Sequence, residues 1–416
     1  MRILFLSDIV DPGVGSSVRQ TFQLARELRK RGHDTAVVGT VRDAADATPT
    51  EVDDCQVYRL HSEYPRRFRA WTSMHNKQID APFEQVLQEW RPDVVHGQLV
   101  HEHLGYHTLT QSKRAGARVL LTAHDVMTFC YQKLTCFHGG EESGGTDFDV
   151  VARASKCIPC QRFRFRPGRN AHIRKVLGRD VDRFHAVSDA LADILRANDL
   201  TVHRTVHNAL DWADTLPSDA DVAAFRRRFG LEGKQVLAIG GRLHSQKGVG
   251  KLLEMLRLLR PQFPDVRLIV MGRREIYDSE FAPQAKDLGV ADLVVPTDWL
   301  NGDELAQAYA AADVFVTPSL CFDTFGLVNL EAMEHAKPVV ATSFGGSCEV
   351  VEHGVTGFIA NPFDLETFAG AIAKLLGDEA CRLEMGRQGR LRLESRFGIA
   401  RLADECLDEY GSPALA

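Results

Sequence analysis

The sequence has no apolar run long enough to span a bilayer and no cleavable leader at its start. A transmembrane helix needs about 20 consecutive apolar residues, and a secretory leader needs a long apolar stretch followed by a cleavage site. The opening residues Met1 to Leu6 instead lead directly into the polar pair Ser7 and Asp8. These absences predict a cytoplasmic protein without a transmembrane segment.

The sequence lacks two further features: a paired set of cysteines and a large excess of charge of one sign. The 416 residues include nine cysteines, an odd number that argues against a disulfide framework in such a chain. The formal net charge is −6 and no nucleic-acid motif occurs. This balance argues against a large non-specific nucleic-acid surface, although it leaves room for a local basic patch.

The composition is otherwise that of an ordinary globular protein, with 44% apolar and 25% charged residues. A chain of 416 residues is too long for one compact core. We therefore expect two domains of about 200 residues each.

Strand-like and helix-like patterns alternate along both halves of the chain. Apolar runs predict buried strands at residues 2–10, 34–39, 92–96, 118–125 and 182–188, and again at 235–243, 267–272 and 357–360. Apolar residues at helical spacing follow several of these runs, and strands that alternate with helices predict parallel sheets. Residues 41–80 are polar and predict irregular structure, and 182–188 is expected to be the last strand of the first sheet.

The stretch from 314 to 347 predicts a strand, a loop and a helix, and it holds two carboxylates. The loop carries Asp323, the helix begins at Gly326 to Val328, and Glu331 lies about a turn further in. Amides at the start of a helix lack partners within the helix and bind anions. This layout suits a sugar nucleotide, with phosphates at the amides and hydroxyls at the carboxylates.

Two cations stand at the turn that follows the strand 235–243. A guanidinium, from Arg242, can grip a phosphate through two parallel hydrogen bonds, and an ammonium, from Lys247, acts as a point charge. Together they could neutralise a diphosphate leaving group, although both could also be solvated surface residues.

These residues resemble the donor site of a known enzyme family. Seven residues separate Asp323 from Glu331, and Pro338 to Thr342 and Gly345-Gly346 follow. This pattern is similar to the E-x7-E donor site of the retaining glycosyltransferases of family 4, the glycosyltransferase group 1 type. Asp323 stands where the family has glutamate. The resemblance covers nearly the whole chain and is strongest from 235 to 376.

The resemblance implies the GT-B fold, an α/β architecture of two Rossmann-like parallel-sheet domains that face each other across a cleft. It implies an N-terminal acceptor-side domain over 1–207 with a cysteine-containing insertion at about 126–170. A C-terminal nucleotide-sugar-binding domain would span 208–390, and a C-terminal helix, 391–416, would cross back to the first domain.

The resemblance also implies roles for single residues. Asp323 would contact the transferred sugar, Glu331 would hold the ribose, and Arg242 and Lys247 would clamp the phosphates as in the family pattern G-R-x4-K-G. His124 ends the strand 118–125, where open parallel sheets place ligand-contacting side chains, and would face the sugar; a capping or core histidine is the alternative. The expected catalytic residues are His124, Asp323, Arg242 and Lys247, and the expected donor-binding residues are Gly15, Arg242, Lys247, Phe325, Gly326, Leu327, Val328 and Glu331.

The implied activity is transfer of a sugar, with retention, from a UDP-, GDP- or ADP-sugar to an acceptor hydroxyl. The leaving phosphate would help to take the acceptor proton, so no dedicated base and no catalytic metal are assigned. Two alternatives stay open: a nucleotide-sugar epimerase or phosphorylase of the same fold, and a non-catalytic sugar-nucleotide-binding protein.

Four cysteines lie in one apolar-poor segment, 129–161. Cys157 and Cys160 have the spacing of a zinc knuckle, and Cys130 and Cys136 could supply two further thiolates. A structural zinc could order this loop, and free thiols are the alternative.

Basic and aromatic residues alternate in two short stretches. Residues 64–71 predict a solvated loop or helix face, or else an acceptor-binding or membrane-surface patch. Residues 162–169 could bind an anionic acceptor, or could lie on a surface element that extends its arginines into water. Peripheral membrane contact is therefore one expectation, and the acceptor itself is not identified.

Overall fold

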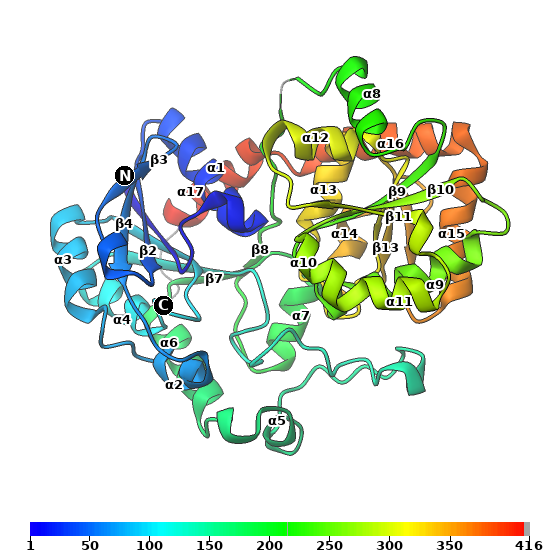
Figure 1. Cartoon of the computed structure of the whole chain (residues 1–416). Helices are drawn as coiled ribbons and strands as arrows, with labels where there is room; N and C mark the ends of the chain where they lie inside the picture. Colours follow the sequence, from blue (N-terminus) through cyan, green and yellow to red (C-terminus); the bar gives the residue numbers. More distant parts are fainter. Residues whose placement is uncertain (214, 412–416) are drawn as a thin grey trace. The chain divides into compact units, whose positions relative to one another are not determined.

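The computed structural model describes residues 1–213 and 215–411, which divide into two compact units (Figure 1). The first unit comprises Met1–Leu134, Val150–Asp211 and the chain from Ile399 onward. The second comprises Thr135–Asp149 and Trp212–Gly398. The expected domain limits lay after 207 and 390, with 126–170 inside the first domain, so the assignment of 135–149 to the second unit is a difference from that expectation.

The first unit is built on an eight-stranded sheet in the order β3-β4-β2-β1-β5-β6-β7-β8. All neighbouring pairs are parallel except β3 with β4. The strands are β1 (Arg2–Ser7), β2 (Asp34–Val41), β3 (Thr50–Val52), β4 (Cys55–His61), β5 (Val94–Leu99), β6 (Arg118–Ala123), β7 (Arg183–Ala186) and β8 (Arg204–Thr205).

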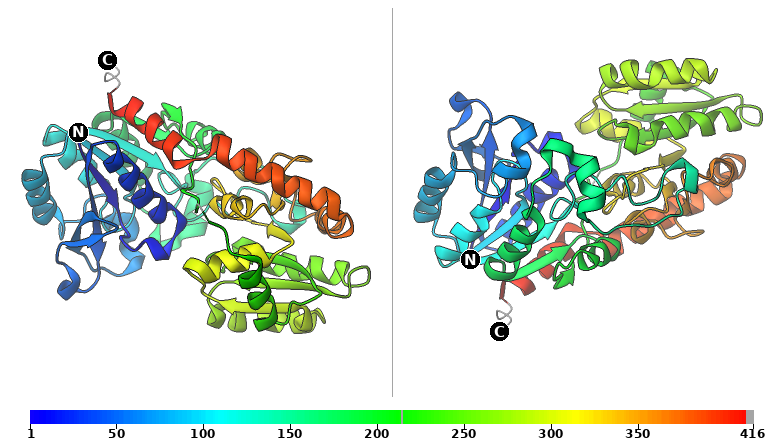
Figure 2. Two further views of the ribbon diagram at one scale, coloured as in Figure 1. Left: turned by 90° about the horizontal axis from the view of Figure 1, so that it is seen from above. Right: turned by 90° about the horizontal axis from the view of Figure 1, so that it is seen from below.

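Helices lie on both faces of this sheet (Figures 1 and 2). They are α1 (Ser16–Lys30), α2 (Arg69–Thr72), α3 (Asp80–Trp90), α4 (His107–Arg114), α5 (Ala154–Gln161), α6 (Arg169–Asp180), α7 (Asp189–Ala197) and α17 (Ile399–Gly411). The last helix, α17, packs against α1, and the hydroxyl of Tyr410 hydrogen-bonds to Nδ1 of His96 at 2.8 Å. The C-terminal helix is thus part of the first unit's core.

The second unit holds a six-stranded parallel sheet in the order β11-β10-β9-β12-β13-β14. Its strands are β9 (Gln235–Gly240), β10 (Val266–Met271), β11 (Val294–Asp298), β12 (Val314–Thr317), β13 (Val339–Thr342) and β14 (Gly357–Ala360). Helices cover both faces, so the strands are mostly apolar, as in β12, where all four residues are buried.

The helices of the second unit pack against one another as well as against the sheet (Figure 1). Helix α9 contacts α11 and α15, whereas α8 contacts α12 and α13 contacts α16. The helices are α8 (Asp219–Arg228), α9 (Val249–Leu259), α10 (Arg274–Ile276), α11 (Ala282–Asp287), α12 (Gly302–Ala311), α13 (Leu327–Glu334), α14 (Ser347–Val350), α15 (Leu365–Gly377) and α16 (Glu379–Arg396).

Two sequence-based expectations for the first sheet are wrong. Residues 41–80 contain β3 and β4, because Cys55, Val57 and Leu60 are buried against the rest of the sheet even though polar residues separate them. The strand β7 is not the last of its sheet, because the two-residue strand β8 pairs beyond it. In the described ranges, no helix is long and apolar enough to cross a membrane.

Candidate active site

Two loops meet at the carboxyl ends of the central strands β9 and β12. The turn after β9 forms a short 3-10 helix, Ser245–Lys247, and ends at Gly248 in the left-handed region (φ 77°). A Cβ atom at Gly248 would lie 1.8 Å from the carbonyl oxygen of Pro318, which begins the loop after β12. Only glycine permits this approach, so the two loops are held in direct contact.

Lys247 and Asp323 form a pair of opposite charges where these loops meet. The pKa of Lys247 is raised, chiefly by the negative charge of Asp323, while burial and the neighbouring Arg242 act in the opposite direction. Asp323 is buried, whereas Arg242 is exposed. The structure therefore brings together three of the four expected catalytic residues.

The position of Asp323 is fixed by the loop that follows β13. Its amide donates to the carbonyl of Phe344 (3.0 Å), and its own carbonyl accepts from the amide of Gly346 (2.7 Å). The hydroxyl of Ser347 donates to Oδ2 of Asp323 at 3.1 Å. Gly345 lies between these contacts at φ 95°, and a Cβ there would sit 2.2 Å from the Asp323 carbonyl oxygen.

The helix α13 begins at Gly326, which has left-handed backbone angles (φ 85°, ψ 52°). No side chain caps this helix start. A Cβ at Gly326 would approach Nδ2 of Asn329 to 2.6 Å and Oγ of Ser347 to 2.8 Å, so glycine is required here. The amides of the expected donor-binding residues Gly326, Leu327 and Val328 thus open a helix at the same edge of the sheet as Lys247 and Asp323.

Glu331 lies one turn into α13 and is buried. Its Oε2 accepts a hydrogen bond from the hydroxyl of Tyr309, on α12, at 2.7 Å. Phe325, the remaining expected donor-site residue of this loop, is buried against Phe397 with ring centroids 5.8 Å apart. The sequence did not predict that Tyr309 contacts Glu331 or that Ser347 contacts Asp323. For Ser347, its position directly after Gly345-Gly346 is a signal in the sequence, whereas Tyr309 has no such signal.

The inserted segment, Thr135–Asp149, packs onto the residues that hold Asp323. Phe137 is 1% exposed, and its ring meets those of Phe322 and Phe344 edge to face, with centroids 6.0 and 5.3 Å apart. The imidazole of His138 stacks on Phe344 at 5.5 Å and 13°. Aromatic pairs at these distances are favourable beyond the area that they bury.

Polar contacts attach the same segment to the second unit. Glu141 forms an ion pair with Lys251 of α9 (2.7 Å), and the carbonyl of Gly144 accepts from Nδ2 of Asn361 (2.8 Å). Gly145 has a φ of 72°, and a Cβ there would lie 2.4 Å from the ring of Phe363. The inserted segment is therefore a fitted part of the second unit, although it lies more than 80 residues before β9 in the sequence.

His124 belongs to the first unit and lies directly after β6. Its Nε2 is 2.6 Å from Oε1 of Gln98, on β5, and the side chain is 8% exposed. Burial lowers its pKa to about 4, so the ring is neutral near pH 7.

Other polar groups surround the same strand ends. His101 and Asp125 form a pair at 2.9 Å, and Asp8, after β1, accepts hydrogen bonds from the amides of Glu102 and Leu104, both at 2.7 Å. Burial raises the pKa of Asp8 to about 6 despite these two bonds. His101 and Asp125 favour each other's charged forms, since the pKa of His101 is raised and that of Asp125 is lowered, so this buried cluster combines a charged pair with the neutral ring of His124.

Gly15, the expected donor-binding glycine of the first unit, precedes α1 in an extended conformation (φ −176°) that any residue can adopt. A Cβ at this position would meet nothing within 4 Å. The backbone here therefore does not require glycine, unlike the backbone at Gly248 and Gly326.

None of the four cysteines expected to bind zinc forms a disulfide. Cys130, Cys157 and Cys160 belong to the first unit and Cys136 to the second. Throughout the described ranges, no group of three or more closely spaced metal-ligating side chains includes any of these thiols. Cys136 lies in the segment Thr135–Asp149, which joins the second unit, and zinc binding by these four thiols stays a prediction.

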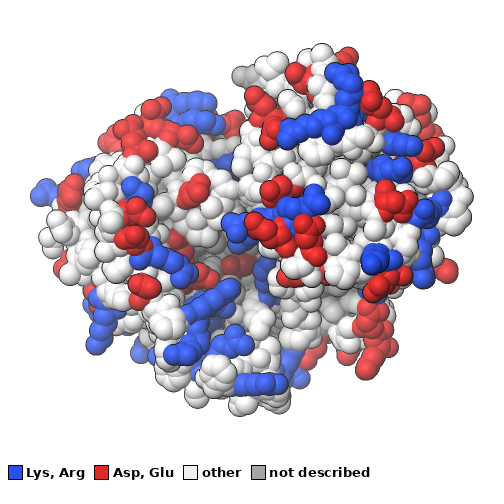
Figure 3. Space-filling view, viewed as in Figure 1, with Lys and Arg blue, Asp and Glu red and all other residues white. Residues whose placement is uncertain are grey.

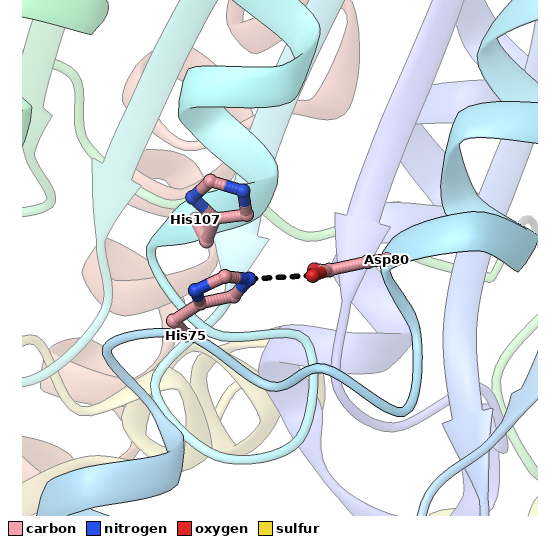
Figure 4. Close-up of side chains that lie close together, drawn as sticks. All are labelled: His75, Asp80 and His107. Carbon is pink, nitrogen blue, oxygen red and sulfur yellow. Dashed lines mark hydrogen bonds and ion pairs between the residues drawn. The ribbon is translucent and has the colours of Figure 1, made fainter.

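A different group of potential ligands lies in the first unit: His75, Asp80 and His107, with ligand atoms within 4.8 Å of one another (Figure 4). Nε2 of His75 is 2.5 Å from Oδ2 of Asp80, and the ring of His107 lies over that of His75 with centroids 3.9 Å apart. The two rings are tilted by 34° to each other. The ion pair and the ring contact account for this cluster.

Comparisons with known proteins agree with this architecture. Residues 221–392 match the family model of the glycosyl transferases group 1, and residues 15–209 match that of the glycosyl transferase 4-like domain. The chain belongs to the group 1 glycosyl transferases. The Bacillus subtilis protein YtcC, named as a glycosyltransferase, is 27% identical over 73% of this chain and 70% of its own length.

Other relatives match over shorter parts. The mannosylfructose-phosphate synthase of Agrobacterium fabrum is 32% identical over 46% of this chain, and the chain covers 43% of that enzyme. The chain thus spans about half the length of several of the curated relatives that it matches.

Solved structures show the GT-B fold. Sucrose-phosphate synthase from Thermosynechococcus elongatus has a TM-score of 0.77 at 20% identity, with 98% of both chains covered. Anabaena HepE, solved in complex with UDP and glucose, has a TM-score of 0.74 at 20% identity, with 99% of this chain and 100% of that chain covered. At this identity the likeness establishes the fold of the glycosyltransferase and nothing finer.

Proposed function

We propose that this glycosyltransferase transfers a sugar, with retention of the anomeric configuration, from a nucleotide diphosphate donor to an acceptor hydroxyl. The observation that carries the proposal is the Lys247–Asp323 pair beside the start of α13, at the carboxyl ends of β9 and β12. A cation and a carboxylate at one loop contact suit a ligand that has both a diphosphate and hydroxyls. Open parallel sheets bind ligands at this edge.

The positive groups would stabilise the departing nucleoside diphosphate. As the glycosidic bond breaks, negative charge grows on the phosphate, and fixed positive charge lowers the barrier. Lys247 stays protonated because its pKa is raised, and Arg242 can add two parallel hydrogen bonds. The amides at the start of α13 would bind the same phosphates.

The two carboxylates would hold the rest of the donor. Tyr309 fixes the orientation of Glu331, which we assign to the ribose hydroxyls. Ser347 and the backbone around Phe344 fix Asp323, which we assign to the transferred sugar. A donor with its phosphate at Lys247 would then place its sugar beside Asp323, and the shorter aspartate arm is compensated by this rigid support.

His124 would hydrogen-bond a sugar hydroxyl as a neutral imidazole, since burial keeps it uncharged. We assign no dedicated general base, because in a same-face mechanism the leaving phosphate helps to take the acceptor proton. UDP-, GDP- and ADP-sugars are the candidate donors. Anabaena HepE, which binds UDP and glucose, makes UDP-glucose the first donor to test. A cytoplasmic location stays a prediction, and structural zinc forms no part of the proposal.

Thermal stabilisation across a panel of nucleotide sugars, followed by turnover with an acceptor panel, tests the proposal. A ligand at 100 times its Kd stabilises the folded state by about 2.7 kcal/mol, which is readily measured. A glycosyltransferase consumes donor only with an acceptor, apart from slow hydrolysis. Conversion of the donor without acceptor would indicate an epimerase, and binding without turnover in any acceptor would indicate a non-catalytic protein.

A further inference from the structure

Two segments of the first unit have a charge composition unlike the rest of the chain. Residues 64–79 and 150–179 together contain 13 Lys and Arg and no Asp or Glu. The whole chain has 50 basic and 56 acidic residues, so its negative net charge arises outside these segments. Arg169 is buried, and three other arginines pair with acidic residues outside the segments: Arg69 with Glu102, Arg174 with Asp199 and Arg179 with Asp180. The other basic residues produce a local positive potential on an otherwise acidic protein.

The fold places the two segments side by side. The guanidinium of Arg166 lies over the ring of Trp71 at 4.9 Å and donates to the carbonyls of Ala70 and Trp71 at 3.4 and 3.2 Å. The hydroxyl of Tyr131 donates to the carbonyl of Arg166 at 3.0 Å, and Arg69 hydrogen-bonds to the carbonyl of Tyr131. The segments therefore form one continuous basic surface, which includes α2 and α5.

Large apolar side chains project from the same basic surface. Phe163 is 76% exposed, and Ile158, Trp71 and Phe68 are each 46% to 49% exposed. Arg66, Arg67, Arg162 and Arg164 beside them are exposed as well. In Figure 3, Lys and Arg side chains gather over the part of the first unit that holds α2 and α5.

We propose that this basic surface docks onto a bilayer that contains anionic lipid. Exposed aromatic and aliphatic side chains gain by entering the boundary between headgroups and acyl chains, while flanking Arg and Lys remain at the anionic headgroups. A soluble polyanion would account for the charge but not for four exposed apolar side chains. The surface would thus bring the enzyme to a membrane, independently of the donor chemistry.

Sedimentation of the full chain with lipid vesicles tests this docking. Vesicles of phosphatidylcholine alone are compared with vesicles that contain about 30% phosphatidylglycerol, because the attraction to Arg and Lys depends on anionic lipid. We expect binding to the anionic vesicles at least about tenfold tighter, and weaker binding as salt is raised from about 0.1 to 0.5 M, since exposed charges are screened.

Variants separate the charged and apolar contributions. The double variant Arg162→Glu with Arg164→Glu should lower affinity for anionic vesicles by at least about tenfold. The matched control, Arg227→Glu with Arg257→Glu, makes the same change in net charge at exposed positions of the second unit and should bind as wild type does. Phe163→Ser with Ile158→Ser should weaken binding to the anionic vesicles without changing retention on a soluble polyanion.

Thermal unfolding of each variant shows whether it is folded, and exposed positions should be tolerated. Equal binding to both vesicle types would overturn the proposal. So would wild-type affinity in the Arg162 and Arg164 variant, or retention on heparin without any partition onto anionic vesicles.

Discussion

The two sheets of this glycosyltransferase carry polar clusters at equivalent edges, but the clusters differ in how charge is treated. In the second unit, Lys247 keeps its charge because Asp323 lies beside it. In the first unit, burial dominates, so that the pKa of His124 falls to about 4 and that of Asp8 rises to about 6. The same architecture therefore holds a charged cluster in the second unit, formed by Lys247 and Asp323, and in the first unit a mixed cluster in which the neutral ring of His124 lies near the charged pair of His101 and Asp125.

Removal of the cation Lys247 from the charged cluster should cause the largest loss of activity. We expect Lys247→Ala to lower kcat/KM for the donor by about 10³-fold, because fixed positive charge at a developing anion contributes about 3–4 kcal/mol. Lys247→Arg should recover part of the activity. Lys286→Ala removes an exposed lysine of α11 and serves as the control. Turnover of Lys247→Ala equal to that of Lys286→Ala would contradict the phosphate role.

The support of the charged cluster can be tested in the inserted segment. Phe137→Ala should lower the free energy of unfolding by about 3 kcal/mol, because it empties a buried aromatic site against Phe322 and Phe344. It should also reduce donor turnover, since the backbone of Phe344 holds Asp323. Denaturant unfolding and kinetics measure the two effects.

Phe148→Ala is the matched control for Phe137→Ala, because the ring of Phe148 lies in the same segment but is 62% exposed. It should cost less than about 1 kcal/mol, as substitutions at exposed positions usually do. Equal destabilisation by the two variants would show that the segment is not fitted into the second unit as described.

Acid should lower the free energy of unfolding through His124 of the first unit. The pKa of His124 lies below its unfolded value of about 6.5, so its contribution to stability is fully present above pH 6.5 and is lost as the pH falls toward 4. Linkage gives a loss of about 2 kcal/mol between pH 7 and pH 5 from this group. In urea unfolding at both pH values, His124→Gln should show a decline smaller by that amount. An identical decline in the variant and the wild type would mean that burial does not lower the pKa of His124 in the folded protein.

Removing the anion of the charged cluster should separate binding from chemistry. Asp323→Asn keeps the size and shape of the side chain and removes its negative charge. It should lower kcat about tenfold, because one hydrogen bond to the transferred sugar is lost. The Kd of the nucleoside diphosphate should not rise, because Lys247 loses its competing partner. Calorimetry measures this Kd, with Asp287→Asn on α11 as the control. A parallel loss of nucleotide affinity would place Asp323 at the phosphates instead.

Local pattern was sufficient to predict much of the second unit. The strands β9 and β12, the start of α13 at Gly326 and the seven-residue spacing from Asp323 to Glu331 depend on neighbouring residues, so the sequence displays them directly. The strand β4 was missed, because its burial depends on pairing with β2 rather than on a clear alternation of its own. The zinc site stays a prediction, and the sequence did not reveal that Cys136 lies in a different unit from the other three cysteines, since spacing along the chain carries no information on which unit a loop joins.

By itself, the sequence determined the fold class and the charge-bearing residues Lys247, Asp323 and Glu331, because parallel-sheet units and helix starts are encoded by short-range periodicity and by residue type. Only the tertiary structure decided how Asp323 is held. Ser347, Phe344 and the inserted segment reach it from distant parts of the chain, and contacts of this range follow from packing and burial rather than from neighbouring residues. The same is true of the basic surface, whose two segments are more than 70 residues apart and meet through Arg166 and Trp71.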